Sequence, residues 1–217
     1  MDLTTLSPKQ RDLLDTLKRS ILSNSNFYLA GGTGLALQLS HRKSIDFDFF
    51  SSTVFSPTRL LDHLKVHFVP GQINIMEMKE GTLIVMLKNI QTSFFHYQYP
   101  LLNKLIVKNG LNVASIEDIS AMKVIAIIQR GSKKDFIDLW AIIKEKQYSL
   151  KDIFFFCQQK YDTIFSESVA LKALVYFQDA EEERIELGMK SNFSWDIVKN
   201  DLTTISREYL NKYLQKS

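Results

Sequence analysis

The sequence is short of the residues that mark several protein classes. It has one cysteine, Cys157, so an internal disulfide is excluded, and no Cys/His spacing resembles a zinc site. Only 8 glycines and 4 prolines occur, which argues against a low-complexity or disordered chain. No apolar run reaches the ~18 residues of a transmembrane helix, and the N-terminus lacks the basic start and apolar stretch of a signal peptide. We therefore expect a cytoplasmic protein that has no membrane partner.

The composition that remains is that of an ordinary globular protein. Of the 217 residues, 45% are apolar and 24% are charged, and 15 phenylalanines and 8 tyrosines provide material for a packed core. The net charge of +3 permits an anionic partner without requiring one. Cys157 ends the apolar run 153–157, so we expect a buried, unreactive thiol.

The first half of the chain alternates between helix and strand patterns. Ser7 followed by Pro8 is a helix start, with the serine as N-cap and the proline at the first helical position, and Ser56 followed by Pro57 repeats this signal. Strands are predicted at 27–30, 45–50, 73–78, 82–87 and 90–99, and a further helix at 33–40. This order predicts a mixed sheet with flanking helices.

From Ser115 onward the pattern is almost entirely helical. Helices are predicted at 115–130, 133–146, 150–161, 166–177 and 195–213. The sequence therefore predicts an α+β fold in two parts, an α/β core at 1–114 followed by a helical C-terminal domain at 115–217.

The first candidate site begins at a glycine pair. A short apolar strand leads into Gly31-Gly32-Thr33, and a helix pattern follows. Glycines let a ligand approach the backbone closely, and a helix N-terminus offers unpaired N–H groups and a partial positive charge. Two roles are open for Thr33, a cap for this helix or a hydrogen-bond donor to a phosphate oxygen. The segment is compatible both with a phosphate site and with a plain strand–turn–helix connection.

Two aspartates follow the glycine pair on a predicted strand. Asp46 and Asp48 are two residues apart, so we expect both carboxylates on one face of the strand and Ile45, Phe47 and Phe49 on the other. Neighbouring carboxylates repel each other unless a cation compensates them. Mg²⁺ is bound in this way, through one or two carboxylates and substrate phosphates, although exposed aspartates paired with neighbouring basic residues would give the same pattern.

These residues also carry a family resemblance. The first block is Gly31-Gly32-Thr33, then Leu35-Ala36-Leu37, then His41-Arg42-x-Ser44-x-Asp46-x-Asp48-Phe49-Phe50. In order and spacing it resembles the AbiEii/AbiGii toxin family of nucleotidyltransferases, within the polymerase-beta-like superfamily. A second block resembles the later motifs of that family: Ser115 to Lys123, then Arg130, then Lys134-Asp135-Phe136-Ile137-Asp138-Leu139.

The resemblance implies the nucleotidyltransferase fold and a site for Mg²⁺ or Mn²⁺ on Asp46 and Asp48. It implies a nucleoside triphosphate (NTP) as substrate, and tRNA or another RNA as acceptor, with a protein or small-molecule hydroxyl left open as the alternative acceptor. It further implies a toxin of a bacterial toxin–antitoxin or abortive-infection system, with a cognate antitoxin as partner. By the same resemblance the catalytic residues are Asp46, Asp48, Lys123 and Asp138. The nucleotide-binding residues it implies are Gly31, Gly32, Thr33, Ser44, Lys123, Arg130 and Lys134.

The residues of the second block also have ordinary structural interpretations. Asp118 and Asp135 each lie three residues after a serine, which is the spacing of a capping box, so we expect helix caps there rather than catalytic groups. Lys123 and Arg130 are seven residues apart and share a helix face, where they would concentrate positive charge for phosphates. Alternatively, Lys123 is a surface lysine, Arg130 pairs with a carboxylate, and Asp138 only orients a lysine.

One part of the superfamily pattern is not found. Active members commonly carry a third carboxylate on a later strand, as base or metal ligand, but the stretch expected to supply it, 90–97, contains no acid. Glu77 is the nearest strand acid that could replace it. His96 is a candidate base, although a histidine among aromatic residues is more often packed than catalytic.

Two functions therefore stay open, and a third is disfavoured. The main hypothesis is a Mg²⁺-dependent nucleotidyltransferase. The alternative is a nucleotide-binding or partner-binding module of the same fold that has lost catalysis. A DNA-binding regulator is disfavoured because the net charge is modest and no helix-turn-helix segment stands out.

Overall fold

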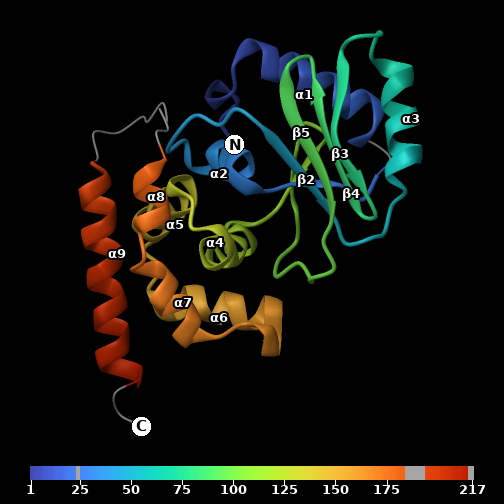
Figure 1. The fold of residues 1–217 in the computed structure, drawn as a ribbon. Coiled ribbons are helices and arrows are strands. Elements are labelled where there is room, and N and C mark those ends of the chain that lie inside the picture. Colours follow the sequence, from blue (N-terminus) through green and yellow to red (C-terminus); the bar gives the residue numbers. More distant parts are fainter. Residues whose placement is uncertain (23–24, 184–193, 215–217) are drawn as a thin grey trace. The chain divides into compact units, whose positions relative to one another are not determined.

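The structure is a computed structural model that describes residues 1–22, 25–183 and 194–214 (Figure 1). The chain divides into two compact units, Met1–Ser115 and Ile116–Ser217. This division lies one residue beyond the boundary expected from the change in sequence pattern. Within the described ranges, no helix has the length and apolar character needed to cross a bilayer.

The first unit is built on a seven-stranded mixed sheet with the strand order β3-β4-β5-β2-β1-β7-β6. β2 runs parallel to β5 and antiparallel to β1, and β1 runs parallel to β7. The predicted α+β class is therefore confirmed. The strands are β1 (Tyr28–Leu29), β2 (Phe47–Ser51), β3 (Ile73–Lys79), β4 (Thr82–Leu87), β5 (Ile90–His96), β6 (Ile106–Lys108) and β7 (Leu111–Val113).

Two helices of this unit begin where their capping residues predict. At the start of α1 (Pro8–Ser20), the Ser7 hydroxyl accepts from the Gln10 N–H, and the Gln10 side chain accepts from the Ser7 N–H, which makes a complete capping box. At the start of α3 (Pro57–His67), the Ser56 hydroxyl accepts from the Arg59 N–H. The remaining helices of the unit are η1 (Leu3–Thr5) and α2 (Gly31–Leu39).

The core of the first unit lies between one face of the sheet and the helices α1 and α3. Along β2 the burial alternates, because Phe47 and Phe49 are fully buried in this core while Asp48 and Phe50 are half-buried. The period of two predicted from the sequence is thus confirmed over β2. It follows that Asp48 points to the face of the sheet opposite the core.

Two boundaries near the candidate site differ from the predictions. The strand expected at 45–50 begins at Phe47, and Ile45 is 81% exposed, so Ile45 does not belong to the apolar face. Asp46 therefore immediately precedes the strand instead of lying within it. The helix expected from Thr33 begins at Gly31, which places Thr33 inside its first turn.

The second unit is helical throughout its described residues. α4 (Ile116–Arg130) packs against three later helices, α5 (Lys133–Lys146), α6 (Leu150–Tyr161) and α7 (Glu167–Leu174), and the same three contact α9 (Trp195–Tyr209). The short α8 (Gln178–Glu182) was not predicted, and α7 ends before the predicted 177. The remaining elements are η3 (Asp162–Ile164) and the π-helical η4 (Leu210–Leu214). Cys157 is fully buried on α6, as predicted.

Candidate functional site

The glycine pair and Asp48 meet at the start of β2. The backbone N–H of Ala30, directly before the pair, donates to the main-chain oxygen of Asp48 at 3.1 Å. Gly31 has a φ of +61°, and a β-carbon built there would lie 2.8 Å from Oδ2 of Asp48. The carboxylate of Asp48 therefore lies directly against the first turn of α2.

Asp46 is held against the same turn by two hydroxyl groups. The Thr33 hydroxyl donates to the main-chain oxygen of Asp46 at 2.5 Å, and the Ser44 hydroxyl donates to Oδ1 of Asp46 at 3.2 Å. A β-carbon at Gly32 would lie 3.4 Å from the Ser44 hydroxyl. Both aspartates are half-buried, so each carboxylate keeps access to solvent.

Thr33 and Ser44 themselves are buried, at 1% and 4% exposure. The Ser44 carbonyl accepts from the Gln10 side chain of α1 at 2.8 Å, which anchors the loop before Asp46. Thr33 does not cap α2, because that helix begins two residues earlier with no side-chain cap on Ala30. Its hydroxyl proton is committed to Asp46, so Thr33 positions the aspartate loop, a role that the sequence did not indicate.

Arg42 is a residue whose place in the site was missed. Its side chain is only 3% exposed, and its guanidinium lies so close to Gly32 that a β-carbon there would overlap Nη2. Nη1 donates to the carbonyl of Lys43 at 2.9 Å. A permanent positive charge is thus fixed beside the N-terminus of α2. The signal was present in the sequence, since Arg42 lies two residues before Ser44 in the first of the two blocks that carry the family resemblance.

The position expected for a third carboxylate is occupied by a serine. β5 lies beside β2, as the expected stretch requires, and Ser93 is the residue paired with Asp48. Glu77 cannot replace the missing acid, because β4 and β5 separate its strand from β2, a span of ~14 Å. Its carboxylate instead pairs with Lys79 at 2.6 Å. Within the described part of the chain, no group of three or more His, Cys, Asp or Glu side chains is arranged to hold a metal.

His96 also lies away from the aspartates. It pairs with Ser51 at the end of β5, and the alternation of the strand places it on the face of Phe94, opposite that of Asp48. A β-carbon at Gly81 would be 3.0 Å from the β-carbon of His96, so the side chain packs against the β3–β4 turn. The hypothesis that His96 is a base beside the aspartates is therefore wrong.

Residues of the second sequence block form a charged cluster inside the second unit. Nζ of Lys123 lies 2.8 Å from Oδ1 of Asp135 and 2.6 Å from Oδ2 of Asp138. The lysine side chain is 6% exposed, and both aspartate side chains are fully buried. Lys123 is therefore no surface lysine, and its charge is shared between two carboxylates.

Asp135 is the centre of this cluster. Arg130 donates to both of its carboxylate oxygens, at 2.7 Å from Nε and 3.1 Å from Nη2, and Ser132 donates at 2.7 Å. Burial by itself would raise the pKa of Asp135, but the charges of Lys123 and Arg130 and their hydrogen bonds hold that pKa well below its usual range. Lys134 lies half-buried in the same turn of α5.

Asp118 and Asp135, which the serine spacing predicts as helix caps, are both partners in ion pairs. Ser132 makes no side-chain cap on α5, and its hydroxyl instead donates to the carboxylate of Asp135. Asp118 accepts from Nζ of Lys160 at 2.7 Å, and both side chains of that pair are fully buried. Serine-to-aspartate spacing alone did not reveal these lysine partners, which come from elsewhere on the chain.

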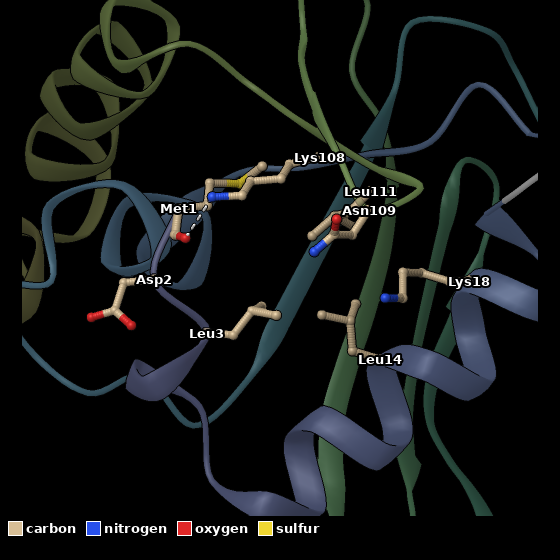
Figure 2. Close-up of a pocket in the computed structure, with 8 residues that line it drawn as sticks. All are labelled: Met1, Asp2, Leu3, Leu14, Lys18, Lys108, Asn109 and Leu111. Atoms are coloured by element: carbon tan, nitrogen blue, oxygen red, sulfur yellow. Dashed lines mark hydrogen bonds between the residues drawn. The ribbon is translucent and has the colours of Figure 1, made fainter.

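A cavity of about 270 Å³ lies elsewhere in the first unit, beside the N-terminal segment (Figure 2). Within it Nζ of Lys108 donates to the carbonyl of Met1 at 3.1 Å. None of the predicted site residues lines it. The lining residues are Met1, Asp2, Leu3, Leu14, Lys18, Lys108, Asn109 and Leu111.

Comparison with known families identifies the family of this chain. The family described as "Nucleotidyl transferase AbiEii toxin, Type IV TA system" matches residues 12–105 and 98–201. The chain belongs to this AbiEii family. The family resemblance of the two sequence blocks is thereby confirmed. Nucleotidyl transfer and a toxin role are the activities that this family assignment supports.

One sequence relative and two solved structures are similar to this AbiEii protein over most of its length. An uncharacterized protein of Aquifex aeolicus, aq_aa25, is 40% identical over 188 residues, which cover 83% of this chain and 87% of the relative. The crystal structure of JHP933 from Helicobacter pylori is similar with a TM-score of 0.57 at 18% identity, over 97% of this chain and 96% of that one. The antibiotic-resistance factor ANT(2'')-Ia is similar with a TM-score of 0.51 at 13% identity, over 70% and 91% of the two chains. At such identities the solved structures show a shared fold.

Proposed function

We propose that this AbiEii protein transfers a nucleotidyl group from an NTP to an acceptor hydroxyl, with Asp46 and Asp48 as the ligands of a divalent cation. The observation that carries the proposal is the position of Asp48, whose carboxylate lies against the glycine turn at the N-terminus of α2. A carboxylate at the place where phosphate would bind is repulsive unless a cation bridges the two anions.

The residues present fit Mg²⁺ or Mn²⁺. The donor set is two half-buried carboxylates with access to solvent, and such a set suits a hard cation that takes its other ligands from water and substrate phosphates. The Ser44 and Thr33 hydroxyls fix the orientation of Asp46, as supporting residues of metal sites do. When bound, the cation would neutralise charge on the phosphates and polarise the reacting phosphoryl group.

In this proposal the protein supplies binding and orientation. The backbone N–H groups at Gly31 and Gly32, together with the buried guanidinium of Arg42, face the triphosphate. The acceptor hydroxyl oxygen forms a bond to the α-phosphorus, the bond from that phosphorus to the bridging oxygen breaks, and pyrophosphate leaves. The hydroxyl proton is released to solvent, because no acid or histidine of the described sheet lies beside Asp48 as an additional base.

The roles of the second block remain predictions drawn from the family. Lys123, Arg130, Lys134 and Asp138 are proposed to contribute to nucleotide binding and catalysis, and all of them belong to the second unit. We likewise propose tRNA or another RNA as the acceptor and a cognate antitoxin as a partner in the cell, since the matching family is one of toxin–antitoxin toxins.

The test is transfer of label. The protein is incubated with Mg²⁺, each α-labelled NTP and total bacterial RNA, and labelled RNA is detected on a gel. We expect transfer by the native chain and a loss of at least a hundredfold in Asp48→Asn. Asp62→Asn is the matched control, because Asp62 is exposed and forms a surface pair with Lys65.

The alternative, a binding module without catalysis, is favoured by one observation, the serine at position 93 where a third carboxylate is expected. Binding of NTP that depends on Mg²⁺ and on Asp48, without label reaching any acceptor, would establish this alternative. Absence of both binding and transfer would contradict the two functions together.

A further inference from the structure

A row of aromatic rings follows Asp48 along its own face of the sheet. Phe50 is two residues further along β2, and the paired residue on β5 is Phe95, with ring centroids 5.4 Å apart. Tyr97 meets Phe50 edge to face at 5.4 Å, and Tyr99 meets Tyr97 in the same manner at 5.0 Å. All four rings are half-buried, so each presents part of its surface to solvent.

Phe50 of this aromatic row also stacks on Tyr28 of β1, with ring centroids 6.1 Å apart, whereas Phe95 and the glycine turn lie on opposite sides of Asp48. β1, which leads into Gly31, flanks β2 on one side, and β5, which carries Phe95, flanks it on the other. The row also extends from Asp48 toward the C-terminal end of β2, and Phe50 is ~7 Å along the strand. Asp48 therefore separates a place for phosphates from a place lined by aromatic rings.

The geometry of the transfer step indicates from which side of Asp48 the acceptor approaches. In displacement at phosphorus, the attacking and leaving oxygens lie roughly in line, on opposite sides of the reacting phosphorus. With the triphosphate on the glycine turn, the pyrophosphate leaves on the side of β1. The acceptor must then approach from the side of β5, where Phe95 lies.

We propose that Phe50, Phe95 and Tyr97 form a stacking platform for the unpaired terminal base of a nucleic-acid acceptor; this inference rests on the proposed nucleotidyl transfer. Adjacent aromatic rings stack on bases of any sequence, because every base offers a π-face. The three side chains carry no charge and offer flat ring faces, against which a planar base can stack. The platform thus selects the class of acceptor and leaves its sequence open.

Binding of a short single strand tests the platform independently of catalysis. Fluorescence anisotropy gives the dissociation constant of a labelled single-stranded oligonucleotide, in RNA and DNA forms, and of the same strand with an abasic 3′-terminal residue. We expect Phe95→Leu to weaken binding of the intact strand roughly tenfold. Binding of the abasic strand should already be weaker in the native protein and should not change further in the variant.

Phe95→Leu removes the ring but keeps an apolar side chain at position 95. A second variant, Phe95→Tyr, keeps the ring and should bind the strand as the native protein does. Phe55→Leu is the matched control, because Phe55 is a half-buried phenylalanine of the same unit that packs on Phe27 outside the row. The RNA and DNA forms show which backbone is preferred, and a base-dependent loss with either supports the platform.

The two proposals can fail separately. If label transfer to RNA is present but strand binding is indifferent to Phe95 and to the terminal base, the platform is wrong and the transferase proposal stands. If base-dependent binding is lost in Phe95→Leu while no transfer occurs under any condition, the platform is a binding surface and the proposed transfer is wrong. Equal losses in Phe95→Leu and Phe55→Leu would also overturn the platform.

Discussion

The carboxylate of Asp48 leaves no room for a side chain on Gly31. A β-carbon at Gly31 would be 2.8 Å from Oδ2 of Asp48, a distance that real contacts do not show, and the φ of +61° already disfavours any residue other than glycine. Two features therefore require glycine at position 31: the backbone conformation of the turn between β1 and α2, and the close approach of the Asp48 carboxylate.

This contact predicts the effect of Gly31→Ala. The substitution should cost about 1 kcal/mol of unfolding free energy for the backbone conformation and should also displace the Asp48 carboxylate, so label transfer should fall at least tenfold. Gly71→Ala is the matched control, since Gly71 has a φ of +88° with nothing within 4 Å of its added β-carbon. Urea unfolding and transfer rates are measured side by side; equal transfer in the two variants would contradict the crowding at Asp48.

The Lys123–Asp135–Arg130 cluster predicts a large loss of stability in the second unit. Asp135→Asn leaves Lys123 buried with a weakened set of partners, so we expect a loss of roughly 3–5 kcal/mol in the free energy of unfolding. Arg130→Gln should cost less than about 1 kcal/mol, because the Arg130 side chain is 58% exposed. Urea denaturation followed by tryptophan fluorescence measures both, and a larger loss in Arg130→Gln would contradict the assigned burial.

The lowered pKa of Asp135 also predicts acid sensitivity. Its folded-state pKa lies below the value of about 3.9 in an unfolded chain, so its stabilisation is fully present above that pH. The stabilisation is lost as the pH falls below about 4 toward the folded-state pKa, because the unfolded chain binds the proton first. The stability difference between the native chain and Asp135→Asn should therefore be constant from pH 7 to 5 and shrink toward pH 3. A difference that grows on acidification would have the wrong sign.

The buried Asp118–Lys160 pair predicts strong coupling between two substitutions. Asp118→Leu or Lys160→Met alone leaves one charge buried without its 2.7 Å partner, which should cost roughly 3–5 kcal/mol. The double variant should be much closer to the native chain in stability, since no charge then remains to be desolvated. Additive losses in the double-mutant cycle would show that the two side chains act independently.

The thiol of Cys157 should be unreactive in the folded protein. Burial raises its pKa well above the usual range and keeps reagents away from it. A thiol-reactive dye at pH 8 should label the native chain at least a hundredfold more slowly than the chain in urea. Rapid labelling of the native protein would show that α6 opens locally.

Several elements of the site could be foreseen because they depend on neighbours in the chain. The N-cap role of Ser7 is a local hydrogen-bond pattern, and the burial of Phe47 and Phe49 follows from strand alternation. The strand was wrongly predicted to include Ile45, because its start depends on residues that are distant in the chain. A strand begins where a partner is available, and the partner of β2 is set by sheet order, which no local pattern contains.

The residues that were missed or reassigned act over long sequence separations. Arg42 turns its guanidinium back onto Gly32, and the lysine that binds Asp118 comes from α6, 42 residues away. Glu77 was a reasonable substitute acid by chain order, yet two strands separate it from β2. These contacts and distances between residues depend on which helices and strands pack together, so a local sequence pattern does not predict them.

The sequence by itself determined the local features of this protein: the glycine turn, the two aspartates that follow it, the alternation of β2 and the change to helices after Ser115. Tertiary structure alone decided that Ser93 and Phe95 lie beside β2, and that Lys123 is enclosed by two aspartates of α5. The physical reason is that turns, caps and side-chain periods are fixed by backbone geometry over a few residues. Strand order and buried charge pairing are fixed by the packing of segments that are distant in the chain.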